Sequence, residues 1–204
     1  DYGIGALPIF PKDEVMTPLG KVLADAGKSQ MRIAETEKYR NLTYYFNGLR
    51  EEPFINEYRA MVPSQKTLNV AEHPEMMAGT ITERALMTMT ERAFDLVAVN
   101  YANADVVAST GNYEATKKAA EIVDQEIGKL MKAALAQNHT LIVVGSHGNA
   151  EKLLDPETGE PDTKNNVDPV PFHLIKPSLK RGTPQKRPRL ASIGLLADVA
   201  PTIL

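Results

Sequence analysis

Apolar runs and amphipathic stretches alternate along the chain and divide it into expected strands and helices. Three apolar runs, at 94–100, 140–146 and 169–175, are typical of buried strands. Between the first two runs, the segment 113–138 has apolar residues at spacings of three and four, which predicts one long helix with a single apolar stripe. The stripe comprises Ala119, Ile122, Val123, Ile127, Leu130 and Met131.

Shorter patterns predict further elements on either side of these runs. We expect a helix at 17–27, with Gly27 as its C-cap, and another helix at 81–93. Short strands are predicted at 31–36 and at 43–48, the second ending in an Asn-Gly turn. Because strands alternate with helices, the predicted fold is α/β, with a mostly parallel sheet sandwiched by helices.

Polar loops follow two of the predicted strands. One loop spans 100–111, and the other lies at 145–151 within the stretch "LIVVGSHGNAE". In sheets of this class, functional groups gather at the carboxyl ends of the strands. The sequence therefore predicts a site where these two loops meet.

Composition excludes some chemistry and favours an intracellular setting. The chain has 204 residues, 43% hydrophobic content and a net charge of −3, which are ordinary globular values. The absence of cysteine excludes disulfides, thiolate metal sites and a cysteine nucleophile. With no apolar run near the roughly 20 residues of a membrane span and no basic signal region, we expect a cytoplasmic or organellar location. Because the chain has no initiator Met, we expect a piece of a longer protein.

Nine motifs in register resemble one enzyme family. In chain order they are "RIAETEKY", "FNG", "EEPF", "VPS", "VNYANADVVASTG", "HGNAE", "DPETGEP", "DPVPF" and "LADVAPTIL". Together they resemble the cofactor-independent (2,3-bisphosphoglycerate-independent) phosphoglycerate mutases of the alkaline-phosphatase superfamily. The resemblance runs from about Thr17 to Leu204 and implies an alkaline-phosphatase-like fold.

The resemblance also implies a reaction and a domain organisation. Family members interconvert 2- and 3-phosphoglycerate through a phosphoserine intermediate, with two divalent metals, usually manganese. Residues 1–204 are similar only to the C-terminal part of the family's phosphatase domain. We therefore expect a single partial domain, without the inserted phosphotransferase domain and without the N-terminal part that carries the nucleophilic serine.

The family's metal ligands are matched incompletely. The resemblance places a family aspartate at Asp105, but Ser109 stands where the family has a histidine. Ser146 and His147 stand at an aspartate–histidine pair, and Asn165 aligns with a further histidine. Serine and asparagine bind divalent metals weakly compared with carboxylate or imidazole. The resemblance therefore predicts that Asp105 and His147 remain from a degenerate site that holds no metal.

Other candidate residues have alternative interpretations. Lys38 matches a family lysine near the phosphoryl group, although a solvated lysine at a helix end is the simpler interpretation. His147 could bind a stray metal or an anion, or only cap local backbone groups. We expect His173 in a core or hydrogen-bonded position, His139 at a helix end and His73 in a surface loop.

The segment 176–189 carries six Lys or Arg residues. A solvated loop between strands accounts for this charge, and so would an acidic protein partner or a nucleic acid backbone. The segment has no interleaved aromatic residues, so stacking on single strands gains no support.

Two functions follow from these patterns. In the first, the chain is a mutase-derived domain without activity that serves as a structural or interaction module. In the second, it belongs to a working phosphoglycerate mutase, or a metal-dependent phosphatase relative, completed by a missing half. A sheet without its N-terminal strands has an open edge, so we expect a partner chain or a missing segment of the same protein to cover it.

Overall fold

The computed structural model describes residues 15–66, 69–91, 94–179 and 194–204. A parallel three-stranded sheet lies at its centre, with strands β1 (Gln30–Glu35), β2 (Glu57–Val62) and β3 (Leu96–Asn100) in the order β2-β1-β3. β1 and β3 confirm the strands predicted at 31–36 and 94–100. β2 was not predicted, because Glu57 and Arg59 interrupt its apolar pattern.

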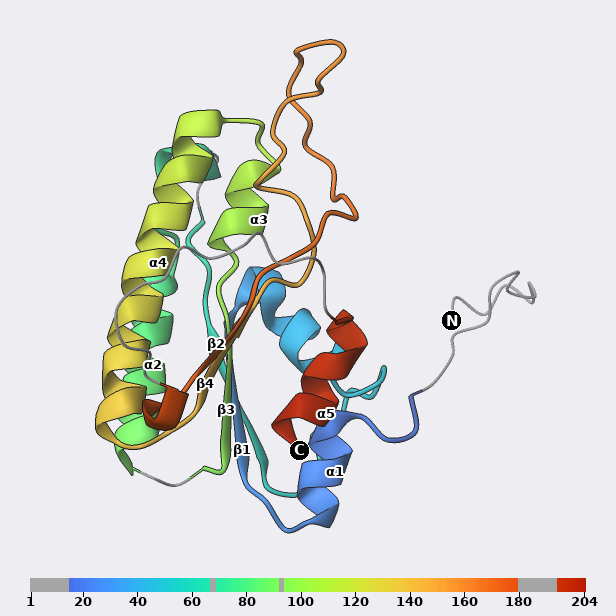
Figure 1. The fold of residues 1–204 in the computed structure, drawn as a ribbon, viewed down its shortest axis with the longest axis vertical. Helices are drawn as coiled ribbons and strands as arrows, with labels where there is room; N and C mark the ends of the chain where they lie inside the picture. The colour runs from blue at the N-terminus through green and yellow to red at the C-terminus, as the bar shows by residue number, and fades with distance from the viewer. Residues whose placement is uncertain (1–14, 67–68, 92–93, 180–193) are drawn as a thin grey trace, which may run out of the picture.

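Helices cover both sides of the strands. They are α1 (Leu19–Asp25), α2 (Ala78–Glu91), α3 (Asn103–Ala108), α4 (Tyr113–Ala136) and α5 (Val199–Ile203). Figure 1 shows α2 and α4 on one side of the strands and α1 and α5 on the other. Gly27 ends the first helix at a φ of 69°, and its N–H bonds to the carbonyl of Ala24, as predicted for a C-cap. The helices predicted at 17–27, 81–93 and 113–138 are confirmed by α1, α2 and α4.

The strand predicted at 43–48 is wrong. This segment forms a π-helical turn, η2 (Asn41–Tyr45), and the chain then reverses at Gly48, which has a φ of 66°. The turn buries Leu42 and Thr43 and places the ring of Phe46 4.1 Å from the guanidinium carbon of Arg32. A short aromatic run does not distinguish strand from helix, and here the helical turn lets an aromatic ring cover a buried cation.

A second, antiparallel sheet holds the last two strands, β4 (Leu141–Val144) and β5 (Phe172–Ile175). They confirm the strands predicted at 140–146 and 169–175, but β5 is not part of a parallel sheet. No helix lies between β4 and β5, so the chain returns through a long loop rather than through the crossover that parallel strands need.

The two faces of the central sheet differ in polarity. On the face toward α2, Ile33 and Val62 pack with Ile81, Ala85 and Leu130 in an apolar core. The opposite face carries polar residues, which we call the interior cluster: Gln30, Arg32, Asn47 and Glu57, which are buried, and Arg59, whose side chain is 14% exposed. Side chains alternate between the two faces along β1 and β2, and this produces the division. The register pairs Ile33 with Ala60 on one face and Arg32 with Arg59 on the other.

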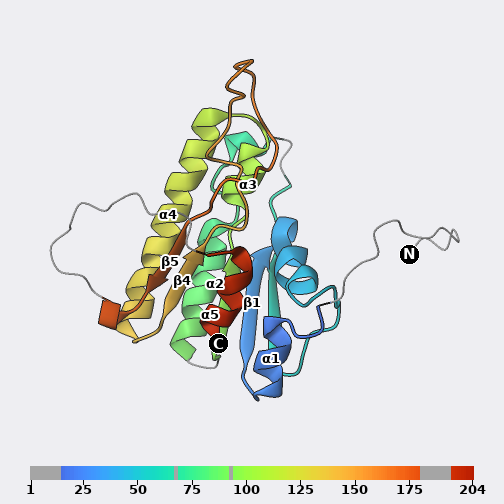
Figure 2. The same cartoon turned by 45° about the vertical axis from the view of Figure 1, so that its right-hand side comes forward.

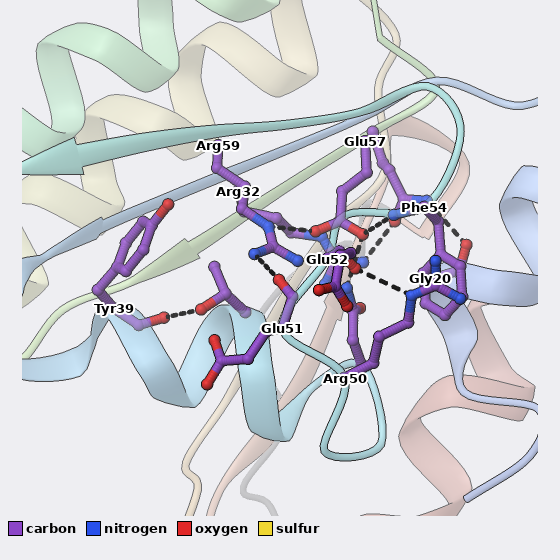
Figure 3. Close-up of polar contacts among 12 residues, drawn as sticks. Gly20, Arg32, Tyr39, Arg50, Glu51, Glu52, Phe54, Glu57 and Arg59 are labelled. Atoms are coloured by element: carbon purple, nitrogen blue, oxygen red, sulfur yellow. Dashed lines mark hydrogen bonds and ion pairs between the residues drawn. The ribbon is translucent and has the colours of Figure 1, made fainter.

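Glu57 organises the interior cluster. Its carboxylate accepts hydrogen bonds from Arg59 Nε at 2.6 Å, Asn47 Nδ2 at 2.7 Å and the Phe54 N–H at 3.0 Å, and Figure 3 shows it between Arg59 and Phe54. Burial lowers the pKa of Arg32 to about 10, although the nearby Glu57 charge opposes this shift and the Arg59 charge adds to it. One carboxylate therefore compensates two guanidinium groups.

Candidate functional site

The loops after β3 and β4 meet, as their positions at strand ends predict. Asp105 lies in the first turn of α3, just beyond β3, and Asn149 lies in the loop after β4. The Asn149 side-chain amide donates a 2.8 Å hydrogen bond to Asp105 Oδ1. The carboxyl ends of the two strands thus converge on Asp105.

Lys38 reaches the same carboxylate from the end of β1. It is the last residue of a 3₁₀ turn, η1 (Thr36–Lys38), and its ammonium forms an ion pair with Asp105 Oδ2. Both side chains are about one-fifth exposed, at 19% and 21%. Burial alone would raise the pKa of Asp105, but the hydrogen bonds from Lys38 and Asn149, with the charges of Lys38 and His147, hold that pKa below its usual value.

His147 borders this group without a close bond to it. Its Nε2 lies 3.8 Å from Asp105 Oδ1, and its Nδ1 lies 3.4 Å from the carbonyl oxygen of Gly148. The first distance is too long for a hydrogen bond, so the imidazole interacts with the carboxylate mainly through charge when it is protonated. The Gly148 contact fits the interpretation of His147 as a residue that contacts local backbone groups.

Asn165 reaches the group around Asp105 from the long loop between β4 and β5. The Asn166 N–H bonds to the Gly148 carbonyl at 2.8 Å, which holds the loop against the end of β4. Asn165 Oδ1 then accepts a hydrogen bond from Asn149 Nδ2 at 3.2 Å. We call Lys38, Asp105, His147, Asn149 and Asn165 the rim cluster.

Ser109 and Ser146 lie at the margin of the rim cluster. Ser109 is exposed, and its hydroxyl donates to the backbone carbonyl of Asp105 at 2.9 Å, one helical turn back. Ser146 is exposed in the bend after β4. The structure thus brings Lys38, Asp105, His147 and Asn165 together and leaves the two serines facing solvent.

Sequence reasoning missed the part that Asn149 takes. The residue falls in the motif "HGNAE" and was not a candidate site residue, yet its amide contacts both Asp105 and Asn165. Its own N–H bonds to Glu151 Oε2 at 2.9 Å, which fixes the loop conformation. The signal available in the sequence was an amide side chain in the polar loop that follows a predicted strand.

Glu35 is a second polar residue that the sequence did not single out. It is fully buried at the end of β1, accepts a 2.9 Å hydrogen bond from the Ser64 hydroxyl, and lies near the Met77 N–H at the start of α2. Burial raises the pKa of Glu35, although both of these donors oppose the shift. Together with His73 and other residues it lines a cavity of about 160 Å³.

The donor groups present do not match a site for two divalent metals. Within the described ranges, no group of three or more His, Asp or Glu side chains is placed to hold a metal ion. Asp105 contributes the carboxylate of the rim cluster, and its two oxygens already bind Lys38 and Asn149. Divalent cations need several carboxylate or imidazole ligands free of competing cations.

The other histidines lie in other segments of the chain. His73 is exposed in a loop and pairs with Glu75 at 3.3 Å, and His139 follows α4, both as predicted. His173 is exposed on β5, so the core position, one of the two alternatives expected for it, is wrong. The short β4–β5 sheet leaves its side chain in contact with solvent.

Of the six basic residues in 176–189, Lys176 is described and exposed, and the other five lie outside the described residues. Among the described helices, none is both long enough and apolar enough to span a bilayer.

Comparison with known proteins identifies the family. Residues 7–204 match the metalloenzyme superfamily. The chain belongs to the metalloenzyme superfamily. Among its relatives, the 2,3-bisphosphoglycerate-independent phosphoglycerate mutase of Chloroflexus aggregans is 44% identical over 205 residues, which cover 100% of this chain. The corresponding protein of Clostridium botulinum is 40% identical over 96% of this chain.

The match extends to structure but covers only part of each relative. A Leishmania mexicana phosphoglycerate mutase, solved at low cobalt concentration, aligns with a TM-score of 0.74 and 28% identity over 79% of this chain and 32% of that one. This metalloenzyme-superfamily chain spans 37% of the length of both the Chloroflexus and Clostridium relatives and corresponds to their C-terminal part. The predicted family resemblance and the α/β, alkaline-phosphatase-like fold are confirmed.

Proposed function

We propose that the chain is a phosphoglycerate-mutase-derived domain that does not catalyse and serves a structural or interaction role in a larger assembly. The observation that carries this proposal is the state of Asp105. One carboxylate oxygen pairs with the Lys38 ammonium and the other accepts from the Asn149 amide. The Lys38 ammonium therefore neutralises the carboxylate charge of Asp105 that would otherwise attract a metal ion.

The chemistry of the family reaction supports this proposal. Phosphoryl transfer in the mutases relies on two divalent cations to activate the serine and to offset charge on the phosphoryl oxygens. Ser109, Ser146 and Asn165 supply neutral oxygen donors at the positions aligned with metal ligands. Loss of one partner that merely orients a metal ligand costs about 10–100-fold in affinity or activity, so three direct replacements predict a larger loss.

The well-formed scaffold supports a structural role. The interior cluster and the loops around Gly148 form regular hydrogen-bonded structure although the ligand set is incomplete. The chain also spans 37% of its mutase relatives, so the remainder of that fold is a natural partner.

A second function is favoured by one specific observation. Lys38, Asp105 and His147 come together at the strand ends, where a working mutase or a metal-dependent phosphatase relative would need them. In this alternative, a missing half supplies the other ligands and phosphoglycerate is the substrate.

Manganese titration separates the two proposals. Calorimetry is performed on the longest natural form of the protein, with mutase activity assayed in parallel. We expect no binding at millimolar manganese and no turnover. Tight binding of two ions together with turnover would make the second function the correct one.

A ligand-restored variant tests the assignment of the three positions. The variant combines Ser109→His, Ser146→Asp and Asn165→His, and Thr90→His on α2 serves as a control for an added exposed histidine. We expect the restored variant to bind manganese at least about 100-fold more tightly than the control. Equal affinities would show that these positions are not where the metal ligands belong.

A further inference from the structure

A cavity of about 160 Å³ lies at the carboxyl ends of β1 and β2. Its wall contains residues that follow these two strands, residues in and after the 3₁₀ turn η3 (Val70–Glu72), and Val106 of α3. Figure 2 shows α3 just beyond the end of β1, and η3 contacts α3. In open α/β sheets, ligands bind at this end of the strands, so the position is one where a ligand is expected.

Glu35 supplies the cavity with a carboxylate that is not fully bonded. The residue is fully buried, and its Oε2 accepts a hydrogen bond from the Ser64 hydroxyl at 2.9 Å. Within the described residues, Glu35 Oε1 has no hydrogen-bond partner. A buried carboxylate oxygen without a partner is costly, and native proteins normally give such an atom a donor. The unbonded oxygen therefore points to a donor from outside these residues.

The charges around Glu35 favour a cationic donor. Burial raises the pKa of Glu35, and the charge of Glu37, which also lines the cavity, raises it further. This ionisable neighbour is thus a second anion. The cation that follows Glu37 in the chain, Lys38, is paired with Asp105. The remaining ionisable group of the wall, His73, is exposed and pairs with Glu75 at 3.3 Å.

The wall does not suit a metal ion. Glu35, Glu37 and His73 all line the cavity, yet within the described ranges no three His, Asp or Glu side chains are placed to hold a metal. Hard divalent cations need several oxygen ligands around them. A primary ammonium has no such requirement, because it donates hydrogen bonds to whichever acceptors are present. Glu35 Oε1 and the oxygens of Ser64 and Gln65 are acceptors of this kind.

The rest of the wall is apolar. Met76 is 9% exposed, and the half-buried Val70 and Val106 pack against its cluster. These side chains cannot solvate a bare ion, but they would cover a hydrocarbon stem. A cavity of about 150 Å³ holds a molecule of the size of benzene. A cavity of about 160 Å³ therefore has room for n-butylammonium, which has fewer non-hydrogen atoms than benzene.

We propose that this cavity binds a primary alkylammonium group, with the ammonium on Glu35 and the alkyl stem against Val70, Met76 and Val106. Two sources offer this group, a free small amine and the side chain of a lysine, and both present the same chemistry to the wall. The proposal goes beyond the inactive-domain proposal and does not rest on it, because no residue of the cavity wall belongs to the rim cluster.

Calorimetry with n-butylammonium chloride tests the site. The titration uses the longest natural form of the protein at about pH 8, where histidine is neutral and a primary amine is charged. n-Butanol is the matched uncharged probe. We expect n-butylammonium to bind at least about 10-fold more tightly than n-butanol, and the amide NMR signals of Ser64, Val70 and Val106 to shift. Affinities that do not differ, no binding of the amine, or shifts confined to other residues would overturn the proposal.

Matched glutamine variants identify the carboxylate. Glu35→Gln removes the charge and keeps an acceptor for the Ser64 hydroxyl. Glu126→Gln is the control, because Glu126 is 7% exposed and also has an unbonded oxygen, Oε2, but does not line the cavity. We expect n-butylammonium binding to weaken at least about 10-fold for the first variant and less than about 2-fold for the second. Equal weakening would reject Glu35 as the group that holds the ammonium.

A filled cavity gives a test that leaves Glu35 in place. Val70→Phe adds volume to the wall and stays informative if Glu35→Gln fails to fold. We expect this variant to bind n-butylammonium at least about 10-fold more weakly than the wild type, because the stem and the added ring compete for the same space. Unchanged affinity would place the amine elsewhere on the protein and reject the cavity.

Nα-Acetyl-lysine amide distinguishes the two sources. Its side chain carries the same ammonium and stem, but its backbone must stay at the mouth of the cavity, where Glu37 and Gln65 are exposed. Affinity similar to that of n-butylammonium supports a lysine side chain as the natural occupant, and much weaker binding supports a free amine. Neither result involves manganese or turnover, so failure of this proposal would leave the inactive-domain proposal standing.

Discussion

The interior cluster and the rim cluster both combine cations with a carboxylate, but they differ in depth. Arg32 is fully buried and Glu57 is 7% exposed, whereas the side chains of Lys38 and Asp105 are about one-fifth exposed. In the interior, each lost partner leaves a charge that water cannot reach. At the rim, water can replace a lost partner, so exchanges of ligand cost the fold little.

This difference would account for a mutase scaffold that persists with serine and asparagine at the positions where the resemblance predicts metal ligands. Glu57 holds Arg59, Asn47 and Phe54 in place at once, so its substitution would disturb β2, η2 and the loop between them. Ser109, Ser146 and Asn165 are exposed, and their identities impose no comparable constraint. The comparison predicts a graded series of mutational effects.

The largest effect is expected for Glu57→Ala. The substitution removes the anion that compensates Arg32 and Arg59, and it leaves the fully buried Arg32 and the partly buried Arg59 without this counter-charge. We expect the free energy of unfolding to fall by about 3–5 kcal/mol, measured by urea denaturation. Glu51→Ala is the control, because its pair with Arg40 is exposed at both ends and should cost less than about 1 kcal/mol. A loss below 1 kcal/mol for Glu57→Ala would remove the contrast between interior and rim.

An intermediate effect is expected where α1 touches the interior cluster. A Cβ added at Gly20 would lie 2.7 Å from Asn47 Oδ1 and 2.9 Å from Arg32 Nη2. Because both atoms belong to the buried network, we expect Gly20→Ala to destabilise by about 1–3 kcal/mol in thermal denaturation. Gly128→Ala in α4 meets nothing within 4 Å and should stabilise by up to about 1 kcal/mol. If both substitutions stabilised the protein, helix propensity, and not contact with the interior cluster, would control the effect at Gly20.

The smallest effect, and one that depends on pH, is expected at the rim. Asp105→Asn should cost about 1–2 kcal/mol at neutral pH, because it removes the charged acceptor of Lys38. The folded-state pKa of Asp105 lies below the ordinary aspartate value of about 3.9, so its contribution is complete above that pH and is lost as pH falls through the folded pKa. Urea denaturation from pH 7 to pH 3 should show the wild-type advantage shrinking below about pH 4. An advantage that stays constant to pH 3 would exclude a depressed pKa for Asp105. Asp25→Asn, at an exposed i,i+4 pair with Lys21, sets the scale of a surface pair at about 0.5 kcal/mol or less.

Much of the fold could be predicted because most of its helices and strands bury an apolar face. The stripe of α4, the apolar runs of β3 and β4 and the cap at Gly27 each carry a local period or turn signal. β2 was missed for the opposite reason, since Glu57 and Arg59 point into the protein while Tyr58 and Met61 are exposed. Local pattern rules treat inward charges as evidence against a strand.

The sequence by itself determined the family, the α/β class and the strand ends at which candidate side chains gather, because these depend on residue spacing and local backbone preference. Only the tertiary structure decided that Lys38 pairs with Asp105, that Asn149 bridges to Asn165, and that β3 and β4 lie in separate sheets. Lys38 and Asp105 are 67 residues apart, so no local pattern links them. Their pairing depends on how three strand ends are placed relative to one another, which packing of the sheet and its helices sets.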